Sequence, residues 1–157
     1  MRRLFIIRKD LHLSGGKLAA MVGHCCEAYW TNLLKKSYND AVKNLTTMYD
    51  VGVGFPIHVD YNIWQEYVNG IFTKTICEAK NKNQLMKVID LINEYNIQVS
   101  DDQKLVEDID YGFINDCCLT ELTPENEDGT TTIGIWFKPL SDDIAHKFSK
   151  KFKLYRD

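Results

Sequence analysis

The chain has 157 residues, of which 45% are hydrophobic, and its formal net charge is −3. This composition fits one compact domain, spanning residues 1–157, that can bury a sizeable core without disulfides. No apolar run is long enough to cross a bilayer, and Leu4–Ile7 is too short for a signal peptide. We therefore expect a soluble cytoplasmic protein with no membrane association.

The first 36 residues predict a strand, a turn and a helix. Leu4–Arg8 is a compact apolar run with basic neighbours, which is typical of a buried strand, and Asp10–Gly16 follows as a turn. From Ser14 a helical spacing of apolar residues begins and ends near Lys36. Its predicted buried stripe consists of Leu18, Val22, Cys25, Tyr29 and Leu33.

Residues 37–70 carry the weakest signals. Ala41–Met48 has helical character, the glycine-rich piece DVGVGFP covers residues 50–56, and the aromatic piece YNIWQEY covers residues 61–67. We interpret this region as a helical excursion and a loop that lead to the next strand.

The rest of the chain alternates strands and helices. Three strands are predicted, at residues 71–79, 113–122 and 131–137, together with helices at residues 81–96 and 139–150. The order of elements predicts an α/β fold, a single domain with a mixed β-sheet of about four strands and helices on both faces.

Charge is distributed unevenly along the chain. Residues 1–36 contain seven Lys or Arg and two acidic residues, a net charge of +5, and residues 138–157 have a net charge of +3. Residues 101–128 contain ten carboxylates and one lysine, a net charge of −9. This polarity permits a basic face for an anionic polymer. An ordinary solvated surface with one acidic loop explains the charges equally well.

The start of the first helix raises a question of charge. Lys17 stands in the first turn, where the helix dipole disfavours a cation, and His24 lies seven residues later on the same face. Gly15 and Gly16 let a ligand approach the free backbone N–H groups, so an oxyanion or phosphate site is one interpretation. The other interpretation is an ordinary helix start, in which Ser14 caps the helix and the lysine lowers its stability only slightly.

These residues resemble a known family. The stretch LFIIRKDLHLSGGKLAAMVGHCCEA, residues 4–28, is similar to the opening of the peptidyl-tRNA hydrolases of the archaeal and eukaryotic type. That opening continues as Gly-Lys-x-Ala-Ala-Gln-x-x-His-Ala. The matching residues are Arg8, Asp10, Leu11, Gly16, Lys17, Ala19, Ala20 and His24.

Later motifs occur in the family's order. The family has a Trp a few residues before a Gly and a strand, similar to Trp64, Gly70 and Phe72–Glu78. Its signature Asp-Ala-Gly-x-Thr-Gln-x-x-Pro resembles DCCLTELTP at residues 116–124, and Thr-Val-Leu-Gly-Ile-Gly-Pro resembles TTIGIWFKP at residues 131–139. The ending KFKLY also matches. The resemblance spans nearly the whole chain, apart from an insertion within residues 38–70 that is atypical of the family.

The resemblance implies an activity and a set of site residues. The family hydrolyses the ester that joins a peptide to the 3′ end of tRNA, and no metal or organic cofactor is implied. Its catalytic lysine, aspartate and two threonines correspond to Lys17, Asp116, Thr120 and Thr131. Asp116 would orient or deprotonate a water, Lys17 would stabilise negative charge, and the threonine hydroxyls would position water or the ester carbonyl.

We also expect substrate contacts outside this set. His24, at a family position, supports the site or packs the helix on the sheet. The expected substrate-binding residues are Gly15, Gly16, His24, Arg8, Lys9 and Lys35, with tRNA phosphates as partners of the basic ones. The sequence leaves open whether the protein forms a homodimer.

Several positions depart from the family pattern. The family glutamine is replaced by Met21, the small pair after the aspartate by Cys117 and Cys118, and a basic residue by Leu119. The segment ENEDG, residues 125–129, lengthens the second motif with negative charge. These changes bear on substrate preference and rate more than on fold.

Two other functions compete with hydrolysis of peptidyl-tRNA. Five cysteines, two pairs of them adjacent, do not form a disulfide framework, and reduced thiols such as Cys25 or Cys117 could act as nucleophiles or zinc ligands. However, the chain has no C-x-x-C or H-x-x-x-H spacing. The second alternative is a binding module for tRNA or protein that has lost turnover, favoured by the acidic block at residues 101–128.

Overall fold

The computed structural model describes residues 1–43 and 54–156. Its core is one five-stranded mixed sheet with strand order β3-β4-β1-β2-β5. The strands are β1 (Arg3–Arg8), β2 (Lys74–Ala79), β3 (Tyr111–Asp116), β4 (Thr131–Phe137) and β5 (Lys153–Leu154). β1 pairs in parallel with β2, and the other three pairings are antiparallel. The mixed α/β fold is confirmed.

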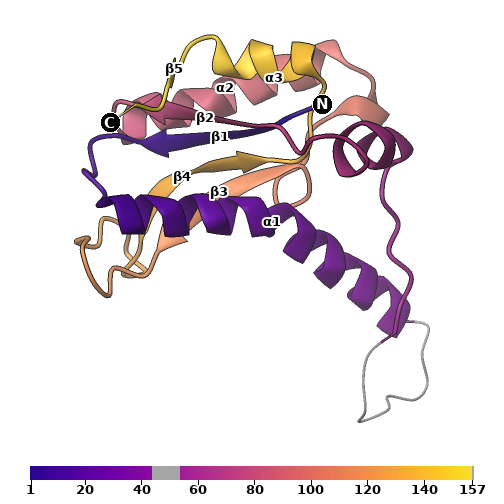
Figure 1. Ribbon diagram of the computed structural model, residues 1–157, viewed down its shortest axis with the longest axis horizontal. Coiled ribbons are helices and arrows are strands. Elements are labelled where there is room, and N and C mark those ends of the chain that lie inside the picture. Colours follow the sequence, from indigo (N-terminus) through magenta and orange to yellow (C-terminus); the bar gives the residue numbers. More distant parts are fainter. Residues whose placement is uncertain (44–53, 157) are drawn as a thin grey trace.

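Helices cover both faces of the sheet, as predicted (Figure 1). α1 (Gly15–Val42) lies on one face, and α2 (Lys82–Gln98) and α3 (Asp142–Ser149) lie on the other. Two short elements complete the described structure, the π-helix η1 (Ile63–Val68) and the 3-10 helix η2 (Asp101–Gln103).

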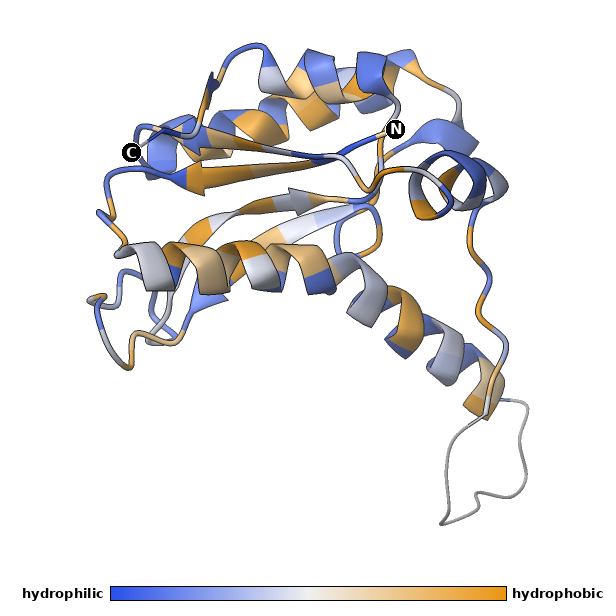
Figure 2. Cartoon of the chain, in the orientation of Figure 1, coloured by the Kyte–Doolittle hydropathy of each residue, from blue (hydrophilic) through white to orange (hydrophobic). Residues whose placement is uncertain are grey.

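The alternation of side chains along β1 divides the core into two layers. Leu4 and Ile6 pack against α2 and α3, whereas Phe5 and Ile7 pack against α1 and η1. Every residue of β1 is buried, which confirms the buried strand expected from its unbroken apolar run. Figure 2 shows this apolar band along the central strands, between the two helical layers.

Several predicted boundaries are corrected by the structure. The first helix extends to Val42 rather than ending near Lys36, and its buried residues are Met21, Cys25 and Tyr29. The strand predicted at 113–122 ends at Asp116, because Cys118 adopts a positive φ of 56° that turns the chain away. β5 was not predicted as a strand. It has only two residues and depends on pairing with Cys77 and Glu78.

The region 37–70 is clarified only in part. Residues 41–42 belong to α1, but residues 44–53 of the predicted helical and glycine-rich pieces lie outside the described residues. The aromatic piece forms η1, whose Ile63 and Tyr67 are buried against the α1 side of the sheet. Within the described ranges, no helix combines the length and apolar character needed to cross a membrane.

We predict that Gly134→Ala destabilises the sheet that carries the site residues. A Cβ at Gly134 would lie 2.5 Å from the Ile6 carbonyl oxygen and 2.7 Å from Ile7 Cδ1, so β1 and β4 would have to separate. We expect a loss of about 1–3 kcal/mol in the free energy of unfolding, measured by urea denaturation.

Gly23→Ala provides the matched control. Nothing lies within 4 Å of a Cβ at this helical position, so the same change should leave stability unchanged or raise it slightly. Equal stability of the Gly134→Ala variant and the native protein would contradict the close approach of the two strands.

Candidate active site

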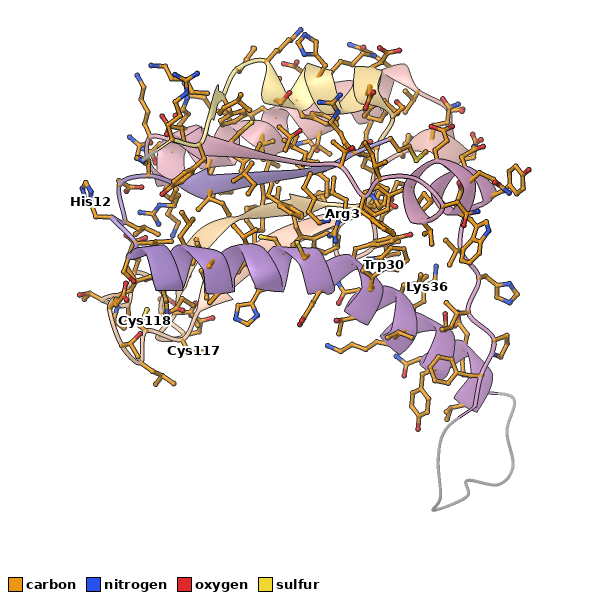
Figure 3. The ribbon with its side chains drawn as sticks, in the orientation of Figure 1. Arg3, His12, Trp30, Lys36, Cys117 and Cys118 are labelled. Carbon is orange, nitrogen blue, oxygen red and sulfur yellow. The ribbon has the colours of Figure 1, made fainter. Side chains whose placement is uncertain are left out.

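Polar side chains gather where the N-terminus of α1 meets one end of the sheet. β1 ends at Arg8 and a short turn leads into α1, while β3 ends at Asp116 and the antiparallel β4 begins at Thr131. The loop between β3 and β4 lies beneath the start of α1, and Figure 3 labels Cys117 and Cys118 there. The topology thus brings residues from both halves of the chain to one place.

Lys17 and Asp116 form the central contact of this site. Lys17 Nζ lies 2.5 Å from Asp116 Oδ2, and the two side chains are only 15% and 7% exposed. The ion pair compensates the lysine for its unfavourable position at the positive end of the helix dipole. The lysine in the first turn is therefore explained by a carboxylate 99 positions later in the chain.

Two opposing effects set the pKa of Asp116. Burial raises the pKa, but hydrogen bonds from Lys17 and from the Cys118 backbone N–H outweigh it, so the net pKa lies below its usual value. The Cys118 N–H donates to Oδ1 at 2.8 Å, and nearby His24 adds to the lowering. Asp116 is therefore a carboxylate at neutral pH, suited to orienting a water and weak as a base.

The two threonines are placed differently. Thr120 is exposed, and its hydroxyl lies 3.4 Å from Lys17 Nζ, within reach of a ligand at the ion pair. Thr131 pairs with Asp116 in the sheet but is fully buried. Its hydroxyl donates to the Thr123 carbonyl at 2.8 Å and accepts from the Glu125 N–H at 3.1 Å. Thr131 is thus committed to shaping the loop.

Glu121 was not among the predicted site residues, yet it anchors the loop between β3 and β4, residues 117–130 and called the site loop below, to α1. Its carboxylate accepts hydrogen bonds from the Ser14 hydroxyl at 2.5 Å and the Ser14 N–H at 3.2 Å. The same Ser14 hydroxyl caps the helix by accepting from the Lys17 N–H. These bonds lower the pKa of Glu121 and hold the neighbouring Thr120 close to Lys17. The sequence signal that could have identified Glu121 was its position in the second motif, where the family has Gln.

The start of α1 remains open to a ligand. Gly15 and Gly16 are exposed, and their N–H groups have no partner among the residues that the structure describes. His24 is exposed about two turns further along the helix. Met21, in contrast, is buried in the core and does not face this site.

The surroundings of Arg8 do not favour its predicted contact with tRNA phosphates, which stays a prediction. Arg8 is 2% exposed and makes five hydrogen bonds, to Asp10, Glu125 and the Thr132 carbonyl. A guanidinium has five N–H donors, so none is left for a phosphate. Hydrogen bonding to Glu125 outweighs burial and raises the pKa of Arg8. Arg8 ties the β1 end to the site loop.

Lys9 and Lys35 lie away from the ion pair. Lys9 contacts Glu78 at 4.0 Å, the Tyr155 ring at 4.4 Å and the Arg156 carbonyl. Lys35 is exposed eighteen residues along α1 from Lys17, about 27 Å at the helical rise. Their predicted contact with tRNA remains a prediction, and it would require a ligand that extends well beyond the site.

The cysteines show no arrangement typical of catalysis. Cys25 is buried, and burial raises its pKa to about 12, so its thiolate form is disfavoured. Within residues 1–43 and 54–156, no group of three or more His, Cys, Asp or Glu side chains is arranged to hold a metal ion. Cys118 contributes instead through its backbone N–H.

Comparison with known proteins identifies the family of the chain. The family model described as Peptidyl-tRNA hydrolase PTH2 matches residues 1–155. Since the match spans nearly the whole chain, the protein belongs to this family, and the resemblance is confirmed. A search of curated proteins finds no match.

The ion pair predicts how stability depends on pH. Because the pKa of Asp116 is lower in the folded protein, the pair stabilises the fold fully above the unfolded-state pKa, near 3.9. That stabilisation is lost as the pH falls through the folded-state pKa. We expect Asp116→Asn to cost about 1–3 kcal/mol at pH 7 and progressively less below pH 4.

The free energy of unfolding, measured by urea denaturation at pH 7 and below pH 4, tests this prediction. Asp90→Asn, on the exposed surface of α2, is the control. A cost at Asp116 that does not change with pH would show that packing, rather than the charge, accounts for it.

Proposed function

We propose that the protein hydrolyses the ester bond between a peptide, or an N-blocked aminoacyl group, and the 3′ end of tRNA, and so recycles peptidyl-tRNA. The observation that carries the proposal is the Lys17–Asp116 pair with Thr120 beside it, at an open helix N-terminus. In this reaction water adds its OH to the acyl carbon and the ester C–O bond breaks. The tRNA 3′ oxygen leaves with the remaining proton.

The contacts suggest a role for each residue. The Lys17 ammonium would stabilise the developing oxyanion, since it is held in place before substrate binds. Asp116 would orient the attacking water and keep Lys17 in position. Thr120 would hold the water or the ester carbonyl through its exposed hydroxyl. Thr131 would support the site by holding residues 123–125 in place.

The alternative proposal is a tRNA-binding or protein-binding module without turnover. Its main support, the acidic block at residues 101–128, is weakened because several carboxylates are paired internally: Asp101 with Lys104, Asp110 with Lys138, Asp116 with Lys17 and Glu125 with Arg8. A polyanion would therefore meet less negative charge than the count suggests.

The reaction assigned here further implies a cytoplasmic protein and one catalytic domain over residues 1–157.

The first functional prediction is that Lys17→Met and Asp116→Ala each reduce release of the acyl group from N-blocked aminoacyl-tRNA by roughly 100-fold or more. Each substitution removes one member of the central pair. Single-turnover rates are measured for variants whose circular dichroism matches that of the native protein.

Lys87→Met is the matched control, because Lys87 is exposed on α2, on the opposite face of the sheet. Unchanged rates for the Lys17 variant would contradict the assigned site. Tight tRNA binding by a native protein without turnover would favour the binding module.

The second functional prediction concerns the loop anchor. Glu121→Ala should lower kcat roughly tenfold, because Thr120 is no longer held near Lys17, while Glu121→Gln should restore most of it. An amide oxygen can still accept a hydrogen bond from Ser14. The measurements are kcat and KM on the same substrate.

Glu127→Ala is the control for the loss of one negative charge, because Glu127 lies in the same loop and is also exposed. Equal kcat values for the Glu121→Ala and Glu121→Gln variants would show that the charge, rather than the anchor, is what matters.

A further inference from the structure

A cavity lies between α1 and η1, far from the ion pair. It has a volume of about 360 Å³, within the range of small-ligand pockets. The residues that matter for its chemistry are Arg3, Trp30, Trp64, Tyr67, Phe72 and Lys74. Figure 3 shows Arg3 and Trp30 close together beside α1. Trp30 follows Lys17 by thirteen helical residues, about 20 Å along the axis.

The walls of the cavity are aromatic and partly open to solvent. Trp64 is 48% exposed and Phe72 is 52% exposed, although both are large apolar side chains. The Phe72 and Tyr67 rings meet edge to face at 5.9 Å. Phe72 has a φ of 52°, a conformation that non-glycine residues rarely adopt. An exposed aromatic cluster of this kind is typical of a binding surface.

Arg3 forms part of the cavity wall, and its Cζ lies 5.0 Å from the Phe5 ring centroid and 5.8 Å from that of Tyr29. It is 1% exposed, and its three nitrogens donate to the carbonyls of Phe137, Cys26 and Cys25 at 3.1, 2.5 and 2.7 Å. Two of the five guanidinium N–H groups have no acceptor, and no carboxylate pairs with Arg3, within the described residues. Burial lowers its pKa, as expected for a charge without a counterion.

The charge around the cavity favours an anionic ligand. Lys74 lies at its rim, with Nζ 6.0 Å from the Phe72 ring centroid, and none of the described residues that line the cavity is acidic. The larger cavity near the end of α1, about 640 Å³, is different, since Asp40, Asp60, Asp108 and Asp110 line it beside four lysines. Only the smaller of these two combines aromatic walls with purely positive charge.

We propose that this cavity binds an unpaired nucleotide of RNA. The base stacks on Trp64 and Phe72, which suits any base because every base has a π face. Lys74 contacts the phosphate, and the buried Arg3 supplies positive potential. The inference rests on the proposed function, since the tRNA substrate would provide the nucleotide. At about 20 Å from Lys17, the contact adds to affinity without taking part in the reaction.

The first experiment uses the tryptophan indole N–H signals in NMR spectra of the whole protein. The chain has three tryptophans, and Trp136 is 2% exposed in the core, so its signal is the internal reference. Adding a single-stranded oligoadenylate should shift the Trp30 and Trp64 signals and leave Trp136 in place. Shifts caused by an acidic peptide but not by the RNA would overturn the proposal in favour of a protein-docking site.

The second experiment measures affinity for deacylated tRNA. Trp64→Ala should weaken binding roughly 5- to 100-fold, and Trp64→Tyr should retain most of it through the remaining ring. Tyr61→Ala is the control, because Tyr61 is 72% exposed in the same segment but does not line the cavity. Unchanged affinity of the Trp64→Ala variant would overturn the inference.

The two proposals can fail separately. Hydrolysis with unaltered tRNA binding by the Trp64→Ala variant would leave the proposed function standing and reject the nucleotide site. If the native protein binds tRNA without turnover, and the Trp64→Ala variant loses this binding, the nucleotide site is retained and hydrolysis is rejected.

Discussion

The ion pair between Lys17 and Asp116 is the contact on which the rest of this site depends. Neither charge is well placed alone, because a cation at a helix N-terminus opposes the dipole and burial disfavours the carboxylate. Together they compensate each other and join α1 to the end of β3. The pair therefore holds an ammonium ready at an exposed helix start, where the Gly15 and Gly16 N–H groups are open. Electrostatic preorganisation of this kind is what hydrolysis through an oxyanion requires.

The carboxylates of the site loop act as anchors more than as repulsive charges. Glu121 is bound to Ser14 at the helix start, and Glu125 is bound to Arg8 at the end of β1. Each bond connects the loop to an element from the first part of the chain. The added negative charge that departs from the family pattern is therefore partly neutralised where it stands. A loop fixed at two points keeps Thr120 near Lys17 with a smaller entropy cost on binding.

α1 connects the two proposed binding regions. Its first turn carries Lys17, the cation of the ion pair with Asp116, and its middle, around Cys26 and Trp30, forms one wall of the aromatic cavity. A ligand that contacts both must extend over about 20 Å, which a nucleic acid does and a small ester does not. The two regions would thus contribute differently: the residues at the start of α1 would carry out the reaction, and those near its centre would add to the affinity for tRNA.

The sequence by itself determined the elements with strong local patterns and the family. β1, β4, α2 and the start of α1 were predictable because apolar spacing and the Ser14 cap are local signals. Lys17, Asp116 and Thr120 were identified from motifs, and the structure brings them together. Only the tertiary structure decided that β5 is a strand, that Arg8 is used internally and that Glu121 is an anchor. Each of these depends on a distant partner: β5 pairs with β2 at separations of 75 and 77 residues, Arg8 binds Glu125 at 117 and Glu121 binds Ser14 at 107, and such pairing leaves no periodic trace in the chain.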